Sequence, residues 1–256
     1  MREFVFLQIS LLLSLSYTEK SWKSLEEFEN GILIKKDKSQ GPGENSFTWH
    51  DDTFHHFRRP TFKMTNGDKG SPKLWLKGRV PYKFATQGFH FTKDEKKEVR
   101  RAMTEFHRKT CIKFVTRTNQ RNFIKIVKVN ADGDTDTCES LVGKQGGGQE
   151  VTLGPGCYTQ DVIIHELMHA LGFYHEHTRK ESREFVTIKR KKVKDDDWVN
   201  FEIHRKHHPV VMNSPYDICS IMHYDNYALI DKHDNDRHCP YPMGEAKTFS
   251  KRDLKR

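Results

Sequence analysis

The stretch that decides the fold is His165-Glu-Leu-Met-His-Ala-Leu-Gly-Phe-Tyr-His175. On a helix, His165 and His169 lie four residues apart, so both side chains emerge from one face with their Cβ atoms roughly 5–6 Å apart. Two imidazoles at that spacing can bind a single cation, and three neutral imidazoles with an open fourth position are typical of a catalytic zinc site. The spacing therefore predicts a metal-binding helix.

The third histidine requires that this helix end before it. If the helix continued past Gly172, His175 would lie about 9 Å beyond His169 along the axis and about 240° around it. Glycine accepts a positive φ, so a sharp turn at Gly172 can bring His175 back to the same ion. We therefore predict an active-site helix over 159–171 that ends at Gly172, with all three histidines binding one Zn²⁺ ion per chain.

Glu166 follows the first histidine directly and is placed to act on water without being a metal ligand itself. Its carboxylate can take a proton from zinc-activated water that attacks a peptide carbonyl, and can pass that proton to the departing amine. This predicts hydrolysis of peptide bonds with Glu166 as general base. A lone buried histidine is more often a satisfied core residue than a ligand, but each further element of this stretch meets a separate geometric need.

Periodicity predicts regular elements on both sides of the motif. Alternation of apolar and polar residues, or a short apolar run, predicts strands over 79–84, 112–117, 123–129 and 149–153. A helix is predicted over 92–110, because Thr92 and Glu95 form a capping box ahead of an apolar face. This order of elements predicts helices packed on a mixed, twisted sheet, and hence an α+β fold.

The amino-terminal part predicts a secreted precursor. Residues 1–16 combine Arg2 with an apolar stretch ending in a small-x-small pattern, which is typical of a secretory signal peptide. That stretch is too short to cross a bilayer, and we expect no membrane span elsewhere. Residues 17–65 are polar, so they are interpreted as a detachable prosegment that precedes a domain over 66–256. We expect the product to be secreted and extracellular.

The net charge bears on the classes of partner, and the number of cysteines bears on the disulfides. The chain has 256 residues, a net charge of +9 and five cysteines, so at least one cysteine is free or pairs outside the chain. Spacing alone does not assign the bridges. The charge leaves open a basic protein for nucleic acid or heparin, but no recognition motif supports nucleic acid. The expected partners are protein or peptide substrates, with contact to polyanions or extracellular matrix through basic residues around 189–194.

The motif HExxHxxGxxH, followed by Glu176, resembles that of the astacin family of zinc endopeptidases within the metzincin clan. Ser220-Ile-Met-His-Tyr224 is similar to the Met-turn of that family. The resemblance runs from about residue 75 to residue 256 and implies a zincin-like fold of two subdomains. It also implies that Met222 lies under the zinc, that Tyr224 is a labile extra ligand supporting the tetrahedral intermediate, and that Glu176 holds the new amino terminus after activation.

The resemblance carries further expectations. It implies a disulfide between Cys138 and Cys157, and a strand over 149–153 at the edge of the cleft, where an extended substrate pairs as an added strand. Family domains end in a further helix whose cysteine pairs with the first one. The domain here is expected to lack that terminal helix, so Cys111 either has no partner or pairs with Cys239.

Departures from the family pattern leave a competing interpretation open. After the motif the chain reads Arg179-Lys-Glu-Ser-Arg-Glu184 in place of the family's Arg-x-Asp-Arg-Asp, which leaves the salt links behind the motif open. A missing helix and an odd cysteine can weaken a marginal fold. The alternative is therefore an inactive pseudo-protease or binding protein on the same scaffold. The complete motif, together with Tyr224, favours the endopeptidase.

Overall fold

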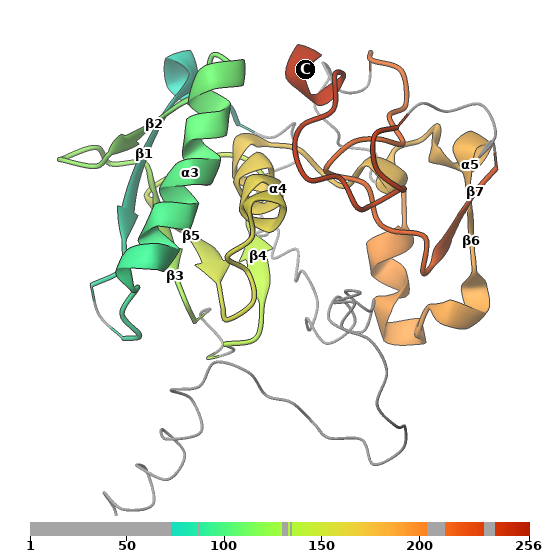
Figure 1. The fold of residues 1–256 in the computed structure, drawn as a ribbon, viewed down its shortest axis with the longest axis horizontal. Coiled ribbons are helices and arrows are strands. Elements are labelled where there is room, and N and C mark those ends of the chain that lie inside the picture. The colour runs from blue at the N-terminus through green and yellow to red at the C-terminus, as the bar shows by residue number, and fades with distance from the viewer. Residues whose placement is uncertain (1–72, 87, 130–132, 134, 204–212, 233–238) are drawn as a thin grey trace, which may run out of the picture. The chain divides into compact units, whose positions relative to one another are not determined.

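The structure, a computed structural model, describes residues 73–86, 88–129, 133, 135–203, 213–232 and 239–256 (Figure 1). All of them belong to one compact unit, His50–Arg256. The predicted signal peptide and prosegment lie outside the described residues. Within the described residues, the helices are too short or too polar to cross a membrane.

The regular elements follow the predicted order, with several short additions. The strands are β1 (Arg79–Phe84), β2 (Lys113–Thr116), β3 (Phe123–Val127), β4 (Cys138–Ser140), β5 (Gly148–Leu153), β6 (Val186–Ile188) and β7 (Leu229–Asp231). The helices are α3 (Lys93–Lys109), α4 (Gln160–Leu171) and α5 (Ser182–Phe185), with 3₁₀ turns η1 (Leu76–Gly78), η2 (Glu176–Thr178), η3 (Arg190–Lys192), η4 (Asp195–Phe201) and η6 (Asp253–Lys255). All four predicted strands and both predicted helices are present.

Five strands form a mixed sheet in the order β2-β1-β3-β5-β4. β1 pairs in parallel with β2 and β3, β3 pairs in parallel with β5, and only β4 runs antiparallel to its neighbour. Strand 149–153, which was expected at the edge of the cleft, is β5 and is not the edge strand of the sheet. Ser140 pairs with Val151 and Cys138 with Leu153, so β4 folds back along β5 and takes the edge position.

Helix α3 begins at the predicted capping box. The Thr92 hydroxyl accepts a hydrogen bond from the Glu95 amide at 3.2 Å, and the Thr92 amide donates to the Glu95 carboxylate at 2.7 Å. Four apolar residues on one face are buried: Val99, Ala102, Met103 and Phe106. This face packs against α4 and β2, and Figure 1 shows α3 and α4 side by side against the sheet. The capping box thus fixes where the helix that supports α4 begins.

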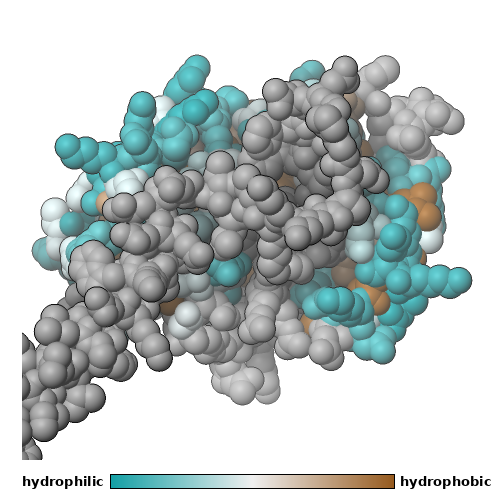
Figure 2. Space-filling view, turned by 60° about the horizontal axis from the view of Figure 1, so that its bottom comes forward, coloured by the Kyte–Doolittle hydropathy of each residue, from teal (hydrophilic) through white to brown (hydrophobic). Residues whose placement is uncertain are grey.

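Two hydrophobic clusters hold the described residues together. The first lies between the sheet, α3 and α4, and contains Ile124, Ile163 and Met222. The second surrounds the small antiparallel sheet of β6 and β7, and contains Phe201 and Leu229. The two clusters agree with the predicted fold of two subdomains. On the face drawn in Figure 2, the surface of the described residues is mostly hydrophilic, with small hydrophobic areas.

Two disulfides close loops in the described chain. Cys138 pairs with Cys157, as expected, with a Cα–Cα distance of 5.8 Å. Cys219 pairs with Cys239 at a Cα–Cα distance of 5.4 Å, and Cys111 is free and exposed. The alternative pairing of Cys111 with Cys239 is therefore wrong, because the turn after Ile218 brings Cys219 to Cys239 instead.

Replacing Thr92 tests the capping box. Thr92→Ala removes the hydroxyl that accepts the Glu95 amide, so we expect the free energy of unfolding to fall by about 1 kcal/mol. Thr92→Ser keeps a hydroxyl and should keep most of the stability. Urea denaturation of the three proteins measures both changes. An equal loss in the two variants would contradict a role for the hydroxyl.

Candidate metal centre

The three histidines of the motif converge on one point. Helix α4 carries His165 and His169, and it ends at Gly172, whose φ is 117°. The Gly172 amide donates to the His169 carbonyl at 2.8 Å, which closes the turn that returns His175 to the helix. Each Nε2 atom lies 3.1 Å from the other two. The glycine turn predicted from the sequence is present.

The protonation of two of these rings follows from their other nitrogen. Nδ1 of His165 lies 2.8 Å from the Ile221 carbonyl oxygen, and Nδ1 of His169 lies 2.7 Å from that of Phe173. A carbonyl oxygen only accepts, so each Nδ1 carries the proton and each Nε2 has a free lone pair. Burial lowers the pKa of both histidines, that of His169 well below its usual range, which keeps the rings neutral.

This arrangement fits a tetrahedral metal ion. Zinc–nitrogen bonds of about 2.0–2.1 Å place neighbouring ligand nitrogens about 3.3 Å apart, close to the 3.1 Å between the Nε2 atoms. Lone pairs that face one another at this distance repel unless a cation lies among them. Within the described residues, these histidines form the one group of three or more potential ligands close enough to share an ion. Neutral imidazole is a common ligand of zinc.

Glu166 lies on the same helix and is buried without a full set of partners. Its Oε2 atom has no hydrogen-bond partner among the described residues. Burial raises the pKa of the carboxyl to about 8, and the charge of Glu139 adds to the effect. A buried carboxyl oxygen without a partner is costly in an ordinary core. On the helix that carries His165 and His169, such a group is suited to transferring a proton.

Tyr224 packs against the third histidine. Its ring centroid lies 4.5 Å from that of His175 and 4.0 Å from that of His177, and the Phe201 ring lies nearly perpendicular to it at a centroid distance of 5.6 Å. Burial, followed by the charge of Glu166, raises the pKa of the phenol, so the hydroxyl keeps its proton at neutral pH. The structure therefore places Tyr224 beside the histidine cluster.

The turn at 220–223 makes hydrogen bonds to the histidine motif through its backbone carbonyls. Besides the Ile221 carbonyl that accepts from His165, the Met222 carbonyl accepts from the amide of Glu176 at 2.8 Å. The Met222 side chain is 1% exposed and belongs to the first hydrophobic cluster. The turn thus contacts both the first histidine and the residue after the third.

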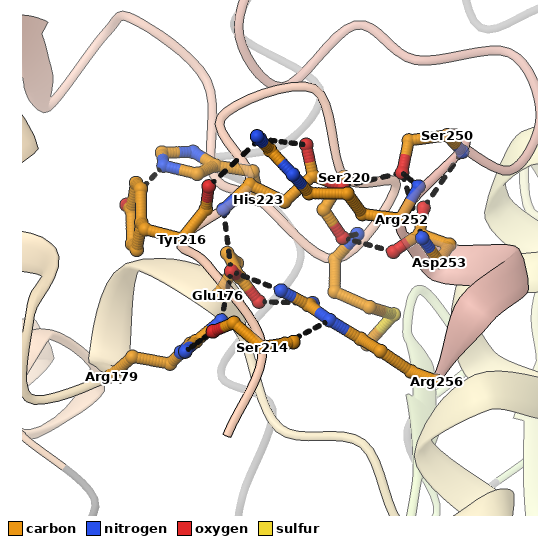
Figure 3. A network of polar contacts seen from close by, with 12 residues as sticks. Glu176, Arg179, Ser214, Tyr216, Ser220, His223, Ser250, Arg252, Asp253 and Arg256 are labelled. Atoms are coloured by element: carbon orange, nitrogen blue, oxygen red, sulfur yellow. Dashed lines mark hydrogen bonds and ion pairs between the residues drawn. The ribbon is translucent and has the colours of Figure 1, made fainter. Parts of the chain in front are cut away.

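Glu176 is enclosed by positive charge, as Figure 3 shows. Its Oε1 accepts from Arg179 at 2.8 Å and from the Asp217 amide at 2.8 Å. Arg256 adds two parallel bonds, one to each carboxylate oxygen, at 2.7 and 2.9 Å. Arg179 thus provides a salt link behind the motif. Arg256 was missed from the sequence, because nothing in its basic surroundings signals a buried pair. The amino terminus expected at Glu176 lies outside the described residues.

The chain is similar to known zinc proteases over most of its length. The model of the astacin family of peptidases matches residues 68–256. The zinc metalloproteinase nas-8 of Steinernema carpocapsae is 37% identical over 165 residues, which are 64% of this chain and 37% of that protein. The low choriolytic enzyme of Oryzias latipes is 33% identical over 242 residues, 86% of this chain and 83% of that enzyme. This chain therefore spans well under half of the first relative and most of the second.

A solved structure agrees with these matches. The high choriolytic enzyme 1 of Oryzias latipes, described as a hatching enzyme zinc-protease, aligns with a TM-score of 0.60 at 31% identity. The alignment covers 72% of this chain and 90% of that enzyme. The two chains thus share their fold over the aligned part.

Substitution of Gly172 tests the turn that returns His175. Gly172→Ala places a Cβ at a left-handed φ, which costs about 1–2 kcal/mol and opposes the turn. We expect weaker Zn²⁺ binding, measured by competition with a chromogenic chelator. Gly156→Ala is the matched control, since Gly156 has a φ of 92° in the exposed turn before α4. Equal zinc affinity in both variants would contradict the assigned role of Gly172.

Proposed function

Because the chain belongs to the astacin family of zinc peptidases, we propose that it is an endopeptidase that hydrolyses peptide bonds in protein substrates. The observation that carries the proposal is the convergence of three Nε2 atoms, each 3.1 Å from the others. The helix that carries two of these histidines also carries the buried Glu166. Of the expected site residues, His165, His169 and His175 would hold the ion. Zinc bound there supplies a Lewis acid for the substrate carbonyl and lowers the pKa of a water molecule.

The residues around the ion would then divide the remaining work. A cation held by the histidines would favour the ionised form of Glu166 and so offset the effect of burial on its pKa. Glu166 then acts as general base: its carboxylate takes a proton from the attacking water and returns it to the departing amine. Tyr224 keeps its phenol proton and offers it as a hydrogen bond to the oxyanion that forms at the carbonyl carbon. The Ile221 and Phe173 carbonyls hold two imidazoles by their Nδ1 protons and so fix their direction.

We also propose that the chain is secreted as a precursor. The supporting observations are the apolar segment within 1–16 and the two disulfides, since disulfides form and persist in oxidising compartments. In this proposal residues 1–16 are a signal peptide, 17–65 a prosegment and 66–256 the catalytic domain. Substrates would then be extracellular proteins.

Removal of the general base separates chemistry from metal binding. Glu166→Gln keeps the size of the side chain and loses its charge, so we expect zinc content to stay at one ion per chain while hydrolysis falls about 10²- to 10⁴-fold. Zinc analysis and cleavage of a denatured protein, after removal of the predicted prosegment, measure the two effects. A chelator should abolish activity in the wild type, and added zinc should restore it.

Two outcomes would contradict the proposed hydrolysis. Glu245→Gln serves as the control, because Glu245 is exposed and loses the same charge. If Glu166→Gln cleaves as fast as this control, the carboxylate is not the general base. A wild type that binds zinc and cleaves nothing would favour the pseudo-protease.

A second proposal concerns the basic residues at 189–194. Lys191, Lys192 and Lys194 are exposed, whereas Arg190 is paired with Asp195. With a net charge of +9, the chain can attract polyanions of the extracellular matrix, and the exposed lysines supply local positive charge for such contact. This contact would hold the enzyme near its substrates.

Reversal of charge tests this contact. The double variant Lys191→Glu and Lys192→Glu should elute from immobilised heparin at lower NaCl than the wild type, because fewer anionic groups are neutralised. The control carries Lys251→Glu and Lys255→Glu, which change the net charge equally at other exposed positions. Equal shifts in the two proteins would mean that only net charge matters and would contradict a local contact.

A further inference from the structure

The segment 250–256 makes two polar contacts next to the candidate metal centre, one with the turn at 220–223 and one with Glu176 (Figure 3). None of its residues belongs to the histidine motif or to the turn at 220–223, and the nearest motif residue lies more than 70 positions away in the sequence. Two of its side chains, Asp253 and Arg256, are nevertheless almost fully buried. Burial of charged side chains at this level requires specific partners, and those partners lie next to the histidines.

Asp253 makes the first contact, with the turn at 220–223. One of its carboxylate oxygens accepts from the Ser220 hydroxyl at 2.7 Å, and the other accepts from the Ile221 amide at 3.0 Å. The Ile221 carbonyl accepts the Nδ1 proton of His165 at 2.8 Å. Ile221 is therefore held by Asp253 on its amide side while it directs His165 from its carbonyl side.

Arg256 makes the second contact, with Glu176. Its guanidinium forms two parallel hydrogen bonds to that carboxylate, and it is itself oriented by a bond from Nε to the Ser214 hydroxyl at 2.8 Å. Both side chains of the pair are 2% exposed. Such bidentate bonds fix geometry as well as charge. Glu176 follows His175 directly, so a fixed carboxylate also fixes the backbone that carries the third histidine.

The two contacts are joined through the backbone between them. The amide of Glu176 donates to the Met222 carbonyl, one residue beyond Ile221. A hydrogen bond within the segment also holds Asp253 in place, because the Ser250 amide donates to the Asp253 carboxylate at 2.9 Å. The segment thus supports His165 and His175 through one connected set of polar contacts, whereas His169 is directed by its own helix and by Phe173.

We propose that Asp253 and Arg256 are positioning residues of the metal centre, which hold His165 through Ile221 and His175 through Glu176. The proposal rests on the proposed function only in taking Zn²⁺ as the ion. Removal of a residue that holds a metal ligand in place typically weakens metal binding about 10- to 100-fold. An ordinary structural role would change stability and leave the affinity of the folded protein for zinc unaltered.

Zinc affinity of the full chain tests the proposal. Arg256→Gln removes the paired charge, and we expect the dissociation constant for Zn²⁺ to rise about 10-fold in a chelator competition well below the melting temperature. The visible spectrum of the Co²⁺-loaded protein should change in band position, since the directions of two ligands change. Lys255→Gln is the matched control, because Lys255 is exposed and loses the same charge one residue earlier.

Further variants keep the result decisive. Asp253→Asn should also weaken zinc binding, since it alters the contact to Ile221. If Arg256→Gln does not fold by circular dichroism, Arg256→Lys replaces it, because lysine keeps the charge and loses the parallel bonds. Folded variants with a lower melting temperature, an unchanged cobalt spectrum and zinc affinity within about twofold of the control would overturn the proposal. A wild type that binds no zinc would instead refute the proposed function.

Discussion

Three imidazole nitrogens directed at one point are the constraint on which the described structure depends. Lone pairs facing one another at 3.1 Å are unfavourable without a cation, so each ring must be held in place by something else. Two carbonyl oxygens hold His165 and His169 by their Nδ1 protons, and the left-handed turn at Gly172 returns His175. The sheet and α3 provide a rigid support for the helix that begins this arrangement.

The features that could be predicted from the sequence are those determined by residues close to one another in the chain. The helices over 93–109 and 160–171 follow from a capping box, an apolar face and a terminal glycine, all within a few residues of one another. The histidine cluster follows from the spacing of residues 165, 169 and 175 and from the freedom of Gly172. Local geometry of this kind needs no knowledge of the rest of the chain.

The parts that could not be predicted depend on distant partners. β4 has three residues, too few to show a period, so the sequence does not predict this strand, which pairs with β5 at the edge of the sheet. The pairing of Cys219 with Cys239 requires the path of the chain between them. Glu176 and Arg256 are 80 residues apart, and a single arginine among many basic residues gives no signal that it is buried.

The two disulfides enclose the segments on either side of the metal-binding helix. One loop, of sequence separation 19, contains β5, and the other, of separation 20, contains the turn at 220–223 together with Tyr224. Helix α4 lies between the two loops and within neither. A chain made in a compartment where thiols stay reduced would have the same histidine motif. It would lack both disulfides, which limit the conformational freedom of the backbone on either side of the helix. Recombinant material from such a compartment would differ physically from the protein in which both disulfides have formed.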